Sequence, residues 1–112
     1  MAFADAILGL VDKLPHSPAG GVIAHQLADS ATSVASNYRA TCNARSRREF
    51  IAKLGLVVEE ADESACWLEL IRRRQMLAVA DISPLLAESL ELRNIFAKSV
   101  GTARANARQM TK

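Results

Sequence analysis

The chain has 112 residues, the length of a single domain, and half of them are hydrophobic. Most of these are aliphatic and only 4% of the chain is aromatic, which favours packed helices over a β-sandwich or a β-barrel. The formal net charge of +2 is too small to indicate a partner by itself. The apolar run over residues 7–11 is too short to span a membrane and lacks the basic flank of a signal peptide, so we expect a cytoplasmic protein with no membrane partner.

The N-terminal half of the chain predicts two helices separated by a proline-containing loop. The first covers residues 2–14 and ends before Pro15, which has no N–H to continue a helix. The second covers residues 18–43, because Ser17 is a suitable N-cap and Pro18 is favoured at the first helical position. Apolar residues recur along it at spacings of three and four, which is typical of a helix with one buried face.

The C-terminal half predicts two more helices and a basic tail. Ser46 and Glu49 have the spacing of a capping box, in which each side chain satisfies a backbone N–H of the first turn. Ser83 before Pro84 again combines an N-cap with a first-position proline. The alanine- and arginine-rich end of the chain is expected to fray. The predicted third helix, fourth helix and frayed tail cover residues 46–75, 83–103 and 104–112.

These segments predict an all-α fold, an antiparallel up-and-down four-helix bundle with a shorter first helix, in a single domain over residues 1–112. The loops between the segments are short, so consecutive helices are expected to run antiparallel. In the third helix, Leu54, Ala61 and Leu68 belong to one apolar stripe and are expected to face the core.

Small polar residues follow one edge of the second predicted helix, beside its apolar stripe. They recur at spacings of three and four, so they share one face of the helix. We expect them to hydrogen-bond across to the third helix and fix its register, because buried hydroxyl and amide groups need partners. A small polar pocket and a subunit interface are the alternatives. The edge consists of Gln26, Ser30, Ser33, Asn37 and Thr41.

Acidic residues cluster in the middle of the third predicted helix. Metal sites in helical bundles use a glutamate followed three positions later by a histidine, and neither His16 nor His25 has that spacing. No metal is therefore expected, and the cluster is interpreted as a solvated face or as a set of ion pairs with Arg39, Arg45 or a neighbouring subunit. The cluster consists of Glu59, Glu60, Asp62 and Glu63.

The chain contains no motif that predicts a catalytic residue or a cofactor. It has no phosphate-binding loop, no dinucleotide fingerprint, no zinc-protease motif and no paired CxxC motif. Cys42 and Cys66 lie far apart in helical patterns, so they are interpreted as buried, reduced thiols.

Basic residues form two clusters. Arg45, Arg47 and Arg48 lie at the joint between the second and third helices, and Arg104 and Arg108 lie four residues apart in the tail. Arginines at a helix end can bind phosphate groups of RNA or DNA, or they can be solvated or contact another subunit. No aromatic residue interleaves with either cluster, so a surface for stacking bases is not expected.

Five segments in a fixed order carry a family resemblance: Gln26–Leu27, Asp29–Tyr38, Ser46–Phe50, Glu59–Glu63 and Trp67–Leu68. Together they resemble the four helix bundle protein family, which is named after proteins encoded in intervening sequences of bacterial 23S rRNA genes. The resemblance implies a compact antiparallel bundle that assembles as a cyclic homopentamer. It also points to a related branch that serves diversity-generating retroelements as an accessory protein, with a basic surface suited to nucleic acid and the reverse transcriptase.

Three functional hypotheses follow from these observations. The first is a non-enzymatic bundle that associates with itself and acts as a scaffold or adaptor. The second is an accessory protein that contacts RNA or DNA through its two arginine clusters. The third, an unrecognised enzyme, has no motif to support it.

Overall fold

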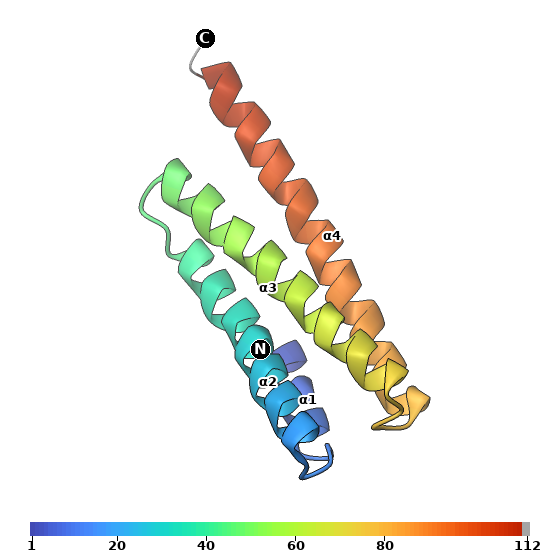
Figure 1. Ribbon diagram of the computed structural model, residues 1–112. Helices are drawn as coiled ribbons and strands as arrows, with labels where there is room; N and C mark the ends of the chain where they lie inside the picture. The colour runs from blue at the N-terminus through green and yellow to red at the C-terminus, as the bar shows by residue number, and fades with distance from the viewer. Residues whose placement is uncertain (111–112) are drawn as a thin grey trace.

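The computed structural model describes residues 1–110, which form four α-helices and no strand (Figure 1). The helices are α1 (Ala2–Val11), α2 (Pro18–Cys42), α3 (Arg47–Arg73) and α4 (Val79–Met110). Each helix packs on the next one along the chain, and α1 also packs on α4, so the four surround a common core. The prediction of an all-α, up-and-down four-helix bundle with a shorter first helix is confirmed.

Side-chain caps fix where α2 and α3 begin. The Ser17 hydroxyl accepts a hydrogen bond of 3.1 Å from the backbone N–H of Gly20. The Ser46 hydroxyl accepts one of 3.0 Å from the N–H of Glu49. The Glu49 carboxylate accepts from the N–H of Arg45, at 3.2 Å, rather than from that of Ser46 as a regular capping box would have it.

One glycine is required where the chain enters α2. A Cβ atom at Gly20 would lie only 2.0 Å from the carbonyl oxygen of Pro15, so no larger residue fits without moving the backbone. The loop can therefore fold back tightly against the first turn of α2.

The end of α1 and the start of α4 differ clearly from the sequence-based expectation. Helix α1 ends at Val11, before the predicted residue 14, although Leu14 is buried in the core. Helix α4 begins at Val79 and not at Ser83, and Pro84 lies inside it. The extra turn includes Ile82, which is completely buried in the core. Burial of this side chain explains why the helix starts before the serine–proline pair.

The predicted frayed tail is helical over most of its length, because α4 continues through residues 104–110. Alanine and arginine are strong helix formers, which accounts for the continuation past Gly101. Residues 111–112 of the predicted tail lie outside the described residues. Figure 1 shows that the end of α4 projects beyond the joint between α2 and α3.

The core consists of aliphatic side chains from all four helices. Leu54, Ala61 and Leu68 are 3%, 0% and 0% exposed, as their place in the apolar stripe predicted. Other fully buried side chains are Ile7, Leu27, Val57, Ile71 and Ile82.

Helix α1 covers only part of the bundle. Its 10 residues span about 15 Å, whereas the 25 residues of α2 span about 38 Å. Figure 1 shows the N-terminus about halfway along α2. The half of the bundle that contains the α2–α3 joint therefore has three helices.

Candidate interaction surfaces

The short α1 leaves an open groove between α2 and α4. Within residues 1–110 the backbones of these two helices make no contact, but Tyr38 and Phe96 bridge them with ring centroids 5.5 Å apart. Further along α4, Phe50 of α3 lines one hollow together with Ile95 and Ala103. We define the open groove by Tyr38, Phe50, Ile95, Phe96 and Ala103.

Three hollows follow the groove along α4. The first, of about 240 Å³, lies between Met1, Tyr38 and Phe96. The second, of about 500 Å³, extends past Phe50 and Ile95. The third, of about 540 Å³, reaches the joint before α3 and shares Phe50 with the second. The groove is thus an extended surface with aromatic side chains rather than an enclosed active-site pocket.

Large hydrophobic side chains in the groove are exposed to solvent. Tyr38 is 47% exposed, Phe50 38% and Ile95 50%. A hydrogen bond with the Cys42 side chain raises the pKa of Tyr38 above its usual value. The Coulomb interaction with Cys42 and then burial add smaller contributions in the same direction. The half-exposed ring of Tyr38 adds apolar surface to the groove.

The two arginine clusters lie at the same end of the molecule. Arg45 and Arg47 line the third hollow together with Ala103 and Asn106 of α4. Arg48, Arg104 and Arg108 are exposed but do not line this hollow. Phe50 also lines the third hollow, so one aromatic side chain lies near Arg45 and Arg47. Phe50 lies in the first turn of α3, next to the joint that carries these arginines.

One member of the predicted polar edge hydrogen-bonds to α3. The hydroxyl oxygens of Ser30 and Ser64 lie 2.9 Å apart, and both side chains are buried. Asn37 and Thr41 instead donate to backbone carbonyls of their own helix, at 2.9 and 2.8 Å. Gln26 and Ser33 are half-buried on the same edge. Of these edge residues, Ser30 thus contacts α3 directly, and its small side chain allows α2 and α3 to pack closely there.

Acidic side chains gather on the outer side of α2 and α3, and we define the acidic face by Asp29, Glu59, Glu60 and Glu63. Partial burial and then the nearby Glu63 carboxylate raise the pKa of Glu60, with smaller contributions from Asp29 and Glu59. None of the four forms an ion pair within residues 1–110. The face is therefore a concentration of uncompensated negative charge.

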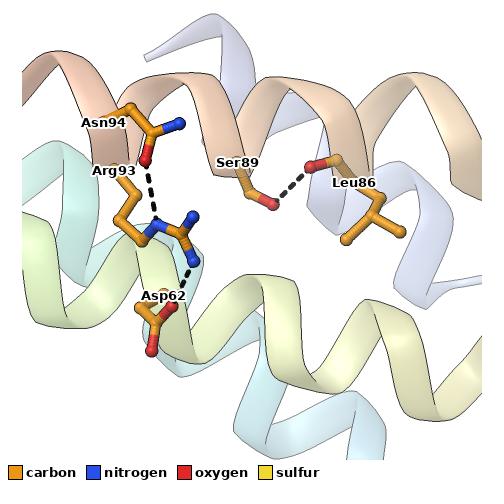
Figure 2. Close-up of polar contacts among 5 residues, drawn as sticks. All are labelled: Asp62, Leu86, Ser89, Arg93 and Asn94. Atoms are coloured by element: carbon orange, nitrogen blue, oxygen red, sulfur yellow. Dashed lines mark hydrogen bonds and ion pairs between the residues drawn. The ribbon is translucent and has the colours of Figure 1, made fainter.

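Asp62, the remaining acid of the sequence cluster, has a partner on α4. Its carboxylate accepts a hydrogen bond of 2.8 Å from Arg93, which also donates to the Asn94 side chain at 3.2 Å (Figure 2). The expected pairing of this cluster with Arg39 or Arg45 is not found among the described residues. Figure 2 also shows Ser89, a buried hydroxyl that donates to the Leu86 carbonyl one turn earlier at 2.9 Å.

The side chains that carry redox or metal chemistry are dispersed. Cys42 and Cys66 are free thiols, but both are exposed, so the expectation of buried thiols was wrong. His16 and His25 are exposed on the loop before α2 and on α2. Within residues 1–110 no three His, Cys, Asp or Glu side chains are arranged to hold a metal ion.

Comparison with known proteins identifies the family. Residues 1–98 match the 23S rRNA-intervening sequence protein family. The chain belongs to this family. No curated protein is similar enough to this chain to count as a match.

A member of the S23 ribosomal protein family from Bacteroides thetaiotaomicron, a protein with unknown function, has a similar structure. The two chains are 29% identical and superpose with a TM-score of 0.81, and the similarity covers 88% of this chain and 92% of that one. The resemblance found in the sequence is thus confirmed at the level of family and fold. Among residues 1–110, no helix is long and apolar enough to cross a membrane.

Proposed function

We propose that this protein is a non-enzymatic helical bundle that associates with copies of itself and acts as a cytoplasmic scaffold or adaptor. The observation that carries the proposal is the open groove, in which Tyr38, Phe50 and Ile95 expose apolar surface along one side of the molecule. Contiguous exposed apolar surface is typical of interaction sites. The resemblance to a family of cyclic homopentamers supports a ring of five copies.

Light scattering coupled to size-exclusion chromatography tests this proposal. We expect a particle with about five times the chain mass of 12.1 kDa. The double substitution Phe50→Ser and Ile95→Ser should reduce the mass, because it removes apolar contact area from the groove. Val22→Ser, at a residue that is 60% exposed on α2 outside the groove, is the control and should leave the mass unchanged. A monomer at every concentration of the wild-type protein would refute self-association.

A second candidate function is binding of RNA or DNA at the α2–α3 joint. The observation that favours it is the third hollow, where Arg45 and Arg47 lie beside the exposed ring of Phe50. Guanidinium groups contact phosphates, and an aromatic ring can stack on a base.

Fluorescence anisotropy with single-stranded RNA and DNA tests the second candidate. Affinity should fall steeply with salt, and Arg45→Ala with Arg47→Ala should reduce the slope of log affinity against log salt by about one per arginine. Arg73→Ala with Arg74→Ala, at the opposite end of α3, is the matched control and should change binding little. Absence of binding at about 50 mM salt would rule this function out.

A further inference from the structure

The open groove and the acidic face lie on opposite sides of the same two helices. On α2, Asp29 precedes Tyr38 by nine residues, and on α3, Glu59 follows Phe50 by nine residues. Nine residues correspond to about two and a half helical turns, so the members of each pair point in opposite directions. A single copy therefore cannot bring these two surfaces together.

The two surfaces carry opposite charges. Arg45 and Lys98 line the groove hollows near Phe50, and neither forms an ion pair within the described chain. Glu88 lies in the hollow farthest from them, beside Met1. The acidic face carries four carboxylates, and none of them forms an ion pair with another residue of 1–110. Each surface thus has a charge that the other can neutralise.

Both surfaces also offer apolar area. The groove exposes Phe50 and Ile95. On α3, Leu56 is 39% exposed three residues before Glu59, and Trp67 donates a hydrogen bond of 3.4 Å to Glu63. An interface with an apolar centre and charged groups around it resembles those of specific complexes.

We infer that the open groove of one copy receives the acidic face of the next copy. This inference rests on the proposed self-association and specifies its geometry. Arg45 and Lys98 of one copy then face Glu59 and Glu63 of its neighbour. Such a contact joins two different surfaces, so it repeats around a closed ring or along a filament. Pairing of groove with groove would instead bring like charges together.

Charge reversal tests the inference, because all four side chains are exposed and can be changed without disturbing the core. Arg45→Glu with Lys98→Glu should make the groove acidic and dissociate the assembly. Glu59→Lys with Glu63→Lys should make the acidic face basic and dissociate it too. We expect each double variant to weaken the contact by about tenfold or more. A chain with all four substitutions has complementary surfaces again and should recover the wild-type mass.

Light scattering gives the mass of each variant, and circular dichroism verifies that each is folded. Lys13→Glu with Glu91→Lys, two exposed charges outside both surfaces, is the control and should keep the wild-type mass. The inference is overturned if the double variants keep the wild-type mass, or if the fourfold variant remains dissociated. A monomeric wild-type protein would refute the proposed self-association itself, so the two failures are distinguishable.

Discussion

Two buried serine hydroxyls, those of Ser30 and Ser64, meet between α2 and α3. The Ser30 hydroxyl can donate to the Leu27 carbonyl at 3.1 Å and the Ser64 hydroxyl to the Glu60 carbonyl at 2.9 Å. Either proton can instead lie between the two hydroxyl oxygens, while the other hydroxyl donates within its own helix. Both serines are packed on all sides, because Ser30 is 1% exposed and Ser64 is 0% exposed, so a larger side chain at either position would displace its neighbours. The pair therefore fixes both the distance and the register of the two helices.

Ser64→Leu is expected to lower the free energy of unfolding by about 1–3 kcal/mol, because a larger side chain would force the helices apart. Urea denaturation measures the change. Ser36→Leu, the same substitution at an exposed position of α2, should alter stability by no more than about 0.5 kcal/mol. Equal effects at the two positions would contradict the assigned packing.

Glu60 should make stability depend on pH. Its pKa is raised above the ordinary value of 4.5, so the folded protein holds the proton more tightly than the unfolded chain. The free energy of unfolding should therefore fall as pH rises from this ordinary value through the raised pKa. Glu60→Gln, which cannot ionise, should be more stable than the wild type at neutral pH and lose that advantage near about pH 4.

Urea titrations at several pH values test this expectation. Glu91→Gln, an exposed acid on α4 outside the acidic face, is the control and should change stability equally little at each pH. A Glu60→Gln advantage that is the same at acidic and neutral pH would show that ionisation is not its cause.

Single-residue contacts were less predictable than the faces on which residues lie. Helical spacing placed Ser30, Asn37 and Thr41 on one edge, yet only Ser30 hydrogen-bonds to α3. Asn37 and Thr41 reach carbonyls four residues earlier on their own helix, which compete with any partner across the interface. Periodicity specifies direction around a helix, but the choice of partner depends on distances that only the packed structure supplies.

At the scale of elements, the two proline-marked helix starts behave differently. Pro18 occupies the first position of α2, where its missing N–H costs no helical hydrogen bond. Pro84 lies inside α4, where it removes a bond to the carbonyl four residues earlier. The sequence could not distinguish them, because both follow a serine, and burial of Ile82 in a turn before Pro84 decided the outcome.

Pro84→Ala should raise the free energy of unfolding by up to about 3 kcal/mol, since it restores a helical hydrogen bond. Pro18→Ala should have the opposite sign and cost about 0.4–1 kcal/mol, because the unfolded chain gains freedom. Thermal and urea denaturation of the two variants measure both changes. Destabilisation by Pro84→Ala would show that the ring is well accommodated in α4.

The apolar stripe of α3 gives an element-level test of the core. Leu54→Ala should lower the free energy of unfolding by about 2–5 kcal/mol, because the side chain is only 3% exposed and its loss leaves a cavity. Leu8→Ala deletes the same atoms at a residue of α1 that is 41% exposed, and should cost much less. Similar losses at both positions would contradict the register of α3.

At the scale of the whole molecule, four antiparallel helices were predictable, but the open groove was not. The groove lies at the Ala2 end of α1, which covers only part of α2, whereas α4 runs on to Met110. A shorter first helix was expected, yet the sequence pattern does not show which side chains of the other helices α1 leaves uncovered. Phe50 and Tyr38 belong to apolar stripes, and only the structure shows that they remain exposed.

The separation of charge within a molecule of net charge +2 predicts how its assembly responds to salt. If the groove of one copy receives the acidic face of the next, added NaCl should raise the dissociation constant, because the screening length falls from about 10 Å at 0.1 M to about 3 Å at 1 M. An interface held by apolar contacts alone should keep or gain strength at high salt. Sedimentation velocity across this range distinguishes the two. The fourfold charge-reversed chain should show the same trend as the wild type, since its opposite charges still face each other.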